Sequence, residues 1–204
     1  MRKSLSRYTW ALRQRLINIK RRLLNWRGDG VHSPYAYNFI RQVIRNPHPF
    51  DAFARLYDPQ LARELRLATG DRAFTRRSML ELLFRCVHAY KPSSVYIIAE
   101  QLSGRKSLVE QYVEATGYSQ RADSAEHSEL IILEQVPDSG MAERLVQQSR
   151  ERMILINMRN AELRAWSQQY RRLLAAPITF SVVGLEIWLW RSKTTPGKYP
   201  VYYK

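Results

Sequence analysis

A strand, a turn and a helix follow one another between Ser93 and Thr116, and this unit restricts the folds that the chain can adopt. Apolar residues from Val95 to Ala99 predict a buried strand, Gln101 to Gly104 predict a turn, and a helix is predicted from Arg105. Together they form half of a βαβ unit. In open α/β sheets, ligands bind at the carboxyl end of such a strand, where helix N-terminal amides hold a phosphate or a carboxylate. We therefore expect a nucleotide-type site at this turn.

The turn itself carries few of the residues that a nucleotide site uses. Glycine is favoured there because a residue without Cβ lets the backbone approach a ligand closely, and a carboxylate at a strand end often binds ribose hydroxyls. The stretch from Ala99 to Arg105 contains one glycine, Gly104, and one carboxylate, Glu100. The candidate cofactor-binding residues here are Ala99, Glu100, Ser103 and Gly104. The scaffold of a cofactor site is thus predicted, with weak support from its chemistry.

Strands and helices alternate along the rest of the chain. The periodicity predicts helices over 34–46, 59–69, 76–90, 105–117, 138–150 and 160–175, and a loop over 46–58. It predicts strands at 95–99, 130–133, 153–156, 179–191 and 200–203, with room for at most a brief edge strand in 118–128. Alternation implies parallel pairing, and the last two strands, joined without a helix, imply an antiparallel hairpin. The expected fold is α/β with a mostly parallel sheet.

Much of the net charge of +15 lies at the beginning of the chain. Residues 1–30 hold nine basic residues against one acid, Asp29, and the basic ones are Arg2, Lys3, Arg7, Arg13, Arg15, Lys20, Arg21, Arg22 and Arg27. Apolar residues recur among them every three or four positions, at Leu5, Tyr8, Leu12, Leu16, Ile19, Leu23 and Trp26. We predict an amphipathic helix extension over residues 1–29 and an α/β domain over 30–204.

Three roles are open for this helix. The favoured one is a helix docked on its own domain with a solvated basic face. The alternatives are contact of residues 2–27 with an anionic membrane surface or with nucleic acid. No apolar run is long enough for a membrane span, and basic residues interrupt any secretory signal. The lone cysteine, Cys86, is expected to pack in the core and suits a reducing cytoplasm, so we expect a cytoplasmic protein, with the inner membrane face as a peripheral location.

Several segments resemble a known family. Gly30-Val31-His32-Ser33-Pro34-Tyr35-Ala36-Tyr37 includes Ser33 as a natural helix N-cap and Pro34 as a natural first helical residue. This opening, the helix segment Leu82-Leu83-Phe84-Arg85, the turn with Leu102 and the antiparallel finish at 179–191 are similar to small bacterial class I S-adenosylmethionine-dependent methyltransferases. The resemblance covers roughly residues 30–204. It implies a Rossmann-like methyltransferase fold and S-adenosylmethionine as a possible cofactor.

The chain departs from this family where the cofactor would bind. The family pattern has an acid and two glycines where this chain has Ile97, Ala99 and Ser103, and Gly104 is one place out of register. About a dozen residues separate the end of the predicted helix from residue 130, too few for the strand, helix and strand that family members carry there. These departures favour a chain that binds no cofactor.

Glu134 matches an acidic position of the family and is the fifth candidate cofactor-binding residue, whereas Asn157 and Met158 stand where aspartates are expected. Glu134 is either a residual catalytic or metal-binding carboxylate or a solvated strand end. We favour the solvated strand end, because no second acid lies nearby in the sequence. The histidines are scattered at positions 32, 48, 88 and 127, so no metal site is expected, and no catalytic residue is assigned.

Three functions follow from these observations. The favoured one is a degenerate methyltransferase-like pseudoenzyme that binds or scaffolds an unknown protein partner. The others are an active methyltransferase on an unknown substrate, and a basic peripheral protein that acts through its N-terminal helix. Methyl transfer depends on holding two reactants in line, an effect worth on the order of 7–11 kcal/mol. Loss of the glycine turn and the ribose contacts forfeits this alignment, which argues against catalysis.

Overall fold

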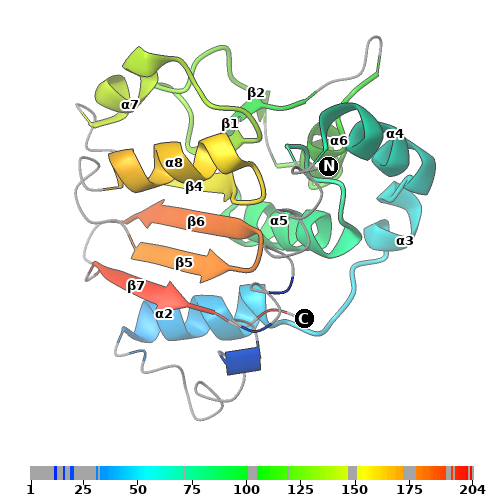
Figure 1. Cartoon of the computed structure of the whole chain (residues 1–204). Coiled ribbons are helices and arrows are strands. Elements are labelled where there is room, and N and C mark those ends of the chain that lie inside the picture. Colours follow the sequence, from blue (N-terminus) through cyan, green and yellow to red (C-terminus); the bar gives the residue numbers. More distant parts are fainter. Residues whose placement is uncertain are drawn as a thin grey trace.

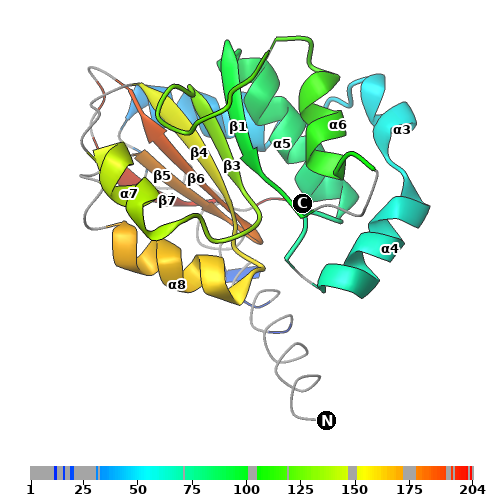
Figure 2. The same ribbon diagram turned by 90° about the horizontal axis from the view of Figure 1, so that it is seen from above.

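The structure is a computed structural model of the chain. It describes residues 12, 16, 19–20, 31, 33–70, 72–100, 105–118, 120–146, 151–171, 178–191, 194, 196–201 and 203. Its described elements form a central β-sheet with helices on both faces (Figures 1 and 2). The predicted α/β class is confirmed. None of the described helices has the length and the apolar composition needed to cross a membrane.

The described strands form one seven-stranded sheet in the order β2-β1-β3-β4-β6-β5-β7 (Figure 1). They are β1 (Ser94–Ile98), β2 (Gln120–Arg121), β3 (Leu130–Leu133), β4 (Arg152–Asn157), β5 (Ile178–Val182), β6 (Leu185–Trp190) and β7 (Gly197–Pro200). Neighbouring strands are parallel except for β6, which runs antiparallel to both β4 and β5. The sheet is therefore mostly parallel, as the alternation of strands and helices predicts.

Two hydrophobic cores lie on opposite faces of the sheet. Leu130 and Ile132 belong to one core, and Ile131 and Leu133 belong to the other. This alternation follows from the two-residue period of a strand, and it explains why β3 is apolar at every position. The core on the first face includes residues of α2 (Pro34–Phe39), the π-helix η1 (Ile40–Ile44), α3 (Ala52–Leu56), α4 (Pro59–Thr69), α5 (Arg77–Tyr90) and α6 (Leu108–Glu114). The second is covered by α7 (Ser139–Val146) and α8 (Ala161–Tyr170) (Figure 2).

Polar caps explain where the helices begin. Ser33 Oγ accepts a hydrogen bond from the Ala36 amide at 3.3 Å, and Pro34 is the first residue of α2, as the sequence predicts. The helix predicted from Arg105 begins later, at Leu108. The reason is a capping box, in which Ser107 Oγ accepts from the Glu110 amide at 3.1 Å and the Ser107 amide donates to Glu110 Oε2 at 2.8 Å.

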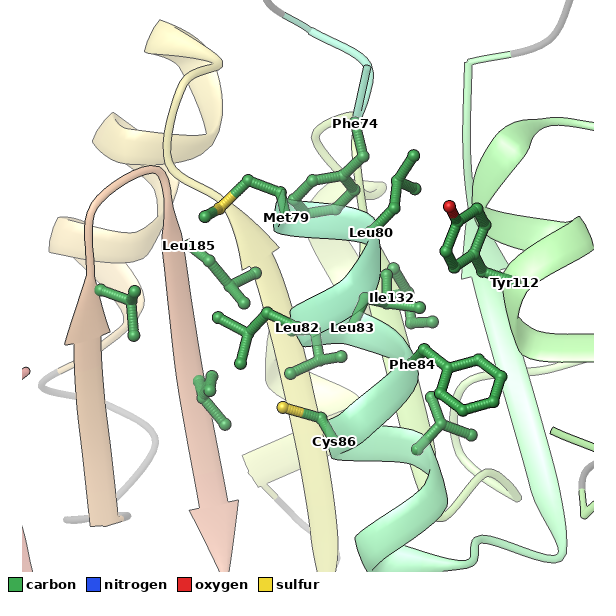
Figure 3. Packing of buried hydrophobic residues seen from close by; sticks show 14 of the residues in the cluster. Phe74, Met79, Leu80, Leu82, Leu83, Phe84, Cys86, Tyr112, Ile132 and Leu185 are labelled. Carbon is green, nitrogen blue, oxygen red and sulfur yellow. The ribbon is translucent and has the colours of Figure 1, made fainter. Parts of the chain in front are cut away.

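Helix α5 packs its apolar face on the sheet (Figure 3). Leu82, Leu83 and Cys86 on this face are fully buried, which confirms that Cys86 is a core residue. Burial raises the pKa of the Cys86 thiol to about 12. The helix ends at Tyr90. The capping residue Lys91 has a left-handed φ of 52°, and Pro92 follows it in the sequence. The segment before this helix, Arg72–Thr75, reaches the carboxyl-terminal edge of the sheet.

The predicted ending of the chain is wrong in two respects. The sequence predicts one strand over residues 179–191, but these residues form most of the β5–β6 hairpin, which turns at Gly184 with a φ of +89°. The antiparallel hairpin therefore lies within this segment. The last strand, β7, covers 197–200 rather than 200–203 and pairs in parallel with β5. Segment 46–58, predicted as loop, contains the short helix α3.

The short edge strand expected in 118–128 is present as β2, which has two residues. Arg121 of this strand reaches α6, where its Nη1 lies 2.5 Å from Glu110 Oε1. The Glu110 side chain is buried, so the ion pair fixes β2 to the helix that follows β1. No further described strand lies beyond β2 at this edge of the sheet. This arrangement agrees with the shortened connection read from the sequence.

Candidate functional site

The carboxyl ends of the three central parallel strands meet at one edge of the sheet. Ile98 of β1 pairs with Leu133 of β3, and Leu133 pairs with Ile156 of β4. The residues that follow these strands are therefore neighbours at this edge, which is where parallel α/β sheets bind ligands. The structure thus brings together three of the positions singled out in the sequence, at the ends of β1, β3 and β4.

Glu134, the residue after β3, is not a solvated strand end. Its exposed fraction is 2%, and both carboxylate oxygens accept hydrogen bonds from backbone amides. Glu134 Oε1 accepts from the Phe74 amide at 2.5 Å, and Oε2 accepts from the Glu100 amide at 2.9 Å. The prediction is wrong because a buried carboxylate can be compensated by donors that are distant in the sequence.

The segment Arg72–Thr75, just before α5, lies against this edge. Its residues Ala73, Phe74 and Thr75 are buried. Besides the bond from Phe74 to Glu134, the side-chain amide of Asn157 donates from Nδ2 to the Arg72 carbonyl at 2.6 Å. The segment is therefore held to the ends of both β3 and β4. Figure 3 shows the Phe74 side chain near the beginning of α5, with Met79 and Leu80 labelled beside it.

The asparagines at the end of β4 have structural roles as well. Asn157 is fully buried, and its Oδ1 accepts a hydrogen bond from the Arg159 amide at 3.0 Å. Asn160 caps α8 through its Oδ1, which accepts from the Glu162 amide at 2.9 Å, and its Nδ2 donates to the Glu134 carbonyl at 2.9 Å. At Asn157 a side-chain amide thus stands where the family resemblance implies an aspartate. The two asparagines link the strand ends to one another.

The electrostatics of Glu134 differ from those of an exposed carboxylate. Burial raises its pKa to about 8, the neighbouring carboxylates of Glu100 and Glu110 add to the rise, and the two amide hydrogen bonds oppose it. Desolvation penalises the charged form, so it is the largest of these effects. A buried, perturbed carboxylate in a cleft would be a candidate acid or base. Here its two oxygens are already bonded inside the protein.

The remaining candidate residues fall into two groups. Ala99 is partly exposed, and Glu100 is buried, with its Oε1 3.4 Å from Arg72 Nε. The candidate cofactor-binding residues Ser103 and Gly104 lie outside the described residues. Leu102 and His32, which carry part of the family resemblance, lie outside them as well. The structure therefore brings Ala99, Glu100 and Glu134 to one place.

An adenosyl group at this edge needs open space and free polar atoms at the ends of β1 and β3. Among the described residues, both Glu134 oxygens are taken by Phe74 and Glu100, and Phe74 itself is 2% exposed. The segment Arg72–Thr75 occupies the place beside the strand ends. At the described residues of this edge, S-adenosylmethionine approaching Glu134 would meet two oxygens that already accept backbone amides.

Among the described residues, no group of three or more His, Cys, Asp or Glu side chains is placed to hold a metal ion. The described histidines have other surroundings. His88 packs its ring with Phe50, Phe84 and Tyr118, and His127 Nδ1 lies 2.9 Å from Ser124 Oγ.

A pocket of about 410 Å³ lies at the opposite, amino-terminal edge of the sheet. Glu129 precedes β3, Glu151 precedes β4 and Arg191 follows the antiparallel β6, so the three meet there. The other lining residues are Tyr35, Asn38, Phe39, Gln42, Val43, Ala89 and Tyr90. Glu129 Oε2 accepts the Ser93 amide at 2.7 Å, and the Arg191 guanidinium lies 4.7 Å from the Tyr35 ring centroid.

The surroundings of this pocket raise the pKa of one of its lining residues, Tyr90. Burial raises the pKa of Tyr90, and the nearby carboxylates of Glu129 and Glu151 raise it further.

The sequence reasoning missed this pocket, because its residues come from five separate segments. The available signal was a glutamate shortly before each of two buried strands, which places two carboxylates at the same edge of a parallel sheet.

Comparison with models of protein families, with curated proteins and with solved structures finds no match for this chain.

Proposed function

We propose that this chain is a degenerate class I methyltransferase-like protein with a Rossmann-like fold, and that it acts as a non-catalytic binding or scaffold protein. The mostly parallel sheet, the two-residue β2 and the antiparallel β6 are consistent with the fold that the sequence resemblance implies, with a shortened edge. Fold alone does not carry a function, so the proposal depends on the chemistry at the edge of the sheet.

One observation carries the proposal. The Glu134 carboxylate, at an acidic position of the family, accepts the Phe74 and Glu100 amides and is buried. A carboxylate that binds a cofactor or a metal ion has to offer acceptor oxygens toward it. Here the segment Arg72–Thr75 takes up part of that capacity. Contact of S-adenosylmethionine with Glu134 would therefore have to displace the segment Arg72–Thr75 or share oxygens that already accept two amides.

The pocket at the amino-terminal edge supports a binding role. Its volume of about 410 Å³ is typical of sites for small molecules, and its polar groups converge from several elements. Glu129 and Glu134 flank the strand β3, and five residues at about 3.3 Å each separate them by roughly 17 Å. A molecule held at Glu129 would thus lie far from the edge where the family binds its cofactor.

The test is binding of S-adenosylmethionine and S-adenosylhomocysteine to the full chain, measured by isothermal titration and by thermal unfolding. We expect no heat of binding and no shift in Tm at millimolar ligand. A ligand present at about a hundred times its Kd stabilises a protein by about 2.7 kcal/mol, which such a scan detects readily. Micromolar binding that is weakened by Glu100→Gln would overturn the proposal.

A further inference from the structure

An apolar stripe on helical residues near the start of the chain is open to solvent. Leu12, Leu16 and Ile19 are helical and are exposed by 59%, 65% and 55%. Spacings of four and three residues place them on one face of a helix. The other large exposed hydrophobic residues of the described chain stand singly, such as Leu67 on α4 and Val136 after β3. Three such residues on one face form a contiguous apolar surface.

The sequence around this stripe is strongly basic. Residues 1–30 carry nine Lys or Arg residues and one acid, and Arg13, Arg15 and Lys20 alternate with the stripe. Lys20, which the structure describes, is exposed. An exposed apolar face bordered by cationic side chains is the pattern of helices that lie in the interface of a bilayer. The expected docking of this helix on its own domain finds no support at the side chains of the stripe.

We propose that this helical segment lies on an anionic lipid surface, with Leu12, Leu16 and Ile19 in the boundary between headgroups and acyl chains. The basic side chains would then face the lipid phosphates, where each contributes attraction that falls off within a Debye length. No described helix can cross a membrane, so the contact is peripheral. This inference does not depend on the closure of the cofactor edge.

Two other occupants fit the stripe less well. Nucleic acid would pair with the basic residues but would leave Leu12, Leu16 and Ile19 in water, because phosphate contacts have no use for an aliphatic face. A second copy of the helix would cover the apolar face, but each copy brings the same nine basic residues, and like charges repel. An anionic bilayer would contact both the apolar stripe, through its acyl chains, and the basic side chains, through its phosphates.

The experiment uses the full chain and sedimentation with vesicles. One set contains phosphatidylcholine alone, and the other adds about 30 mol% phosphatidylglycerol at about 0.1 M salt. The test variant is Leu12→Ser/Leu16→Ser/Ile19→Ser, which keeps every charge. The matched control is Leu67→Ser, an exposed leucine on α4, at 78%. Circular dichroism and Tm verify that both variants are folded.

We expect the wild type to bind anionic vesicles at least about tenfold more tightly than neutral ones. The triple variant should lose at least about tenfold in affinity, and Leu67→Ser should bind like the wild type. Equal binding by the triple variant and the wild type would overturn the proposal, as would no binding to anionic vesicles. The proposal would also be overturned if the chain bound a DNA duplex more tightly than the anionic vesicles and the triple variant kept that binding. It would likewise be overturned if the wild type formed a dimer that the triple variant did not form.

Discussion

The backbone amide of Phe74 lies 2.5 Å from Oε1 of Glu134, although 60 positions separate the two residues. The same carboxylate accepts the Glu100 amide through its other oxygen at 2.9 Å. One side chain therefore joins the segment before α5 to the ends of β1 and β3. Burying a carboxyl group is costly, and hydrogen bonds from two amides offset part of that cost. Glu134 thus holds the fold together at the place where a cofactor would be expected.

Replacing this carboxylate should destabilise the protein. In Glu134→Gln, one carboxamide oxygen can still accept, but the NH2 group faces a second backbone amide that also donates. Leaving one buried donor without a partner costs roughly 1–3 kcal/mol of unfolding free energy. Urea denaturation at about pH 6 followed by circular dichroism measures this cost, because the folded pKa of about 8 keeps the wild-type carboxyl protonated there and its hydroxyl oxygen can still accept the second amide. The control is Glu114→Gln, an exposed partner of Lys106, which should change stability by less than about 1 kcal/mol. Equal stabilities of the two variants would contradict this role of Glu134.

Glu134 should also make stability depend on pH. Burial raises its pKa to about 8, whereas an unfolded glutamate titrates near about 4.3. Between these values the folded protein binds more protons than the unfolded chain. Its contribution is therefore fully present below the unfolded pKa and is lost as pH rises through the folded pKa. Unfolding free energies measured from about pH 5 to about pH 8.5 should fall more steeply for the wild type than for Glu134→Gln. Parallel profiles would show that Glu134 does not titrate in this way.

Cys86 should be inert in the folded protein. Its side chain is fully buried in the first core, and burial raises the thiol pKa to about 12, so little thiolate exists near neutral pH. A thiol-reactive dye should label the native chain very slowly and should react completely in denaturant. Labelling at the rate of free cysteine under native conditions would mean that α5 does not pack as described.

Local patterns predicted the elements but not the contacts between distant ones. The continuous apolar run Leu130–Leu133 identified β3 with its observed bounds, and Ser33 with Pro34 identified the start of α2. Burial of Glu134 was not predictable, because its partner Phe74 belongs to a segment with no local sign of its position. The Val183-Gly184 pair inside a long apolar run was a turn signal, since a glycine within a strand often marks a break.

Arg171 and Glu186 offer a test of a second buried carboxylate. Glu186 of β6 is 1% exposed, and it accepts hydrogen bonds from Arg171 at the end of α8 and from Ser167 Oγ, the latter at 2.8 Å. Removing one member of a buried ion pair leaves an uncompensated charge, which costs about 3–5 kcal/mol. We therefore expect Arg171→Met to destabilise the chain by this amount, measured by urea denaturation.

The double variant Arg171→Met/Glu186→Gln should recover part of that loss. With both charges removed, the carboxamide oxygen introduced by Glu186→Gln still accepts from Ser167, so no buried charge remains at this position. A double-mutant cycle should then give a coupling energy of about 1 kcal/mol or more, because the effects of residues in one hydrogen-bonded network are not additive. If the changes in unfolding free energy of Arg171→Met and Glu186→Gln simply add, Arg171 does not compensate the Glu186 charge. Helix α8 is then held to β6 by its apolar contacts, such as Trp166 stacked on Trp188.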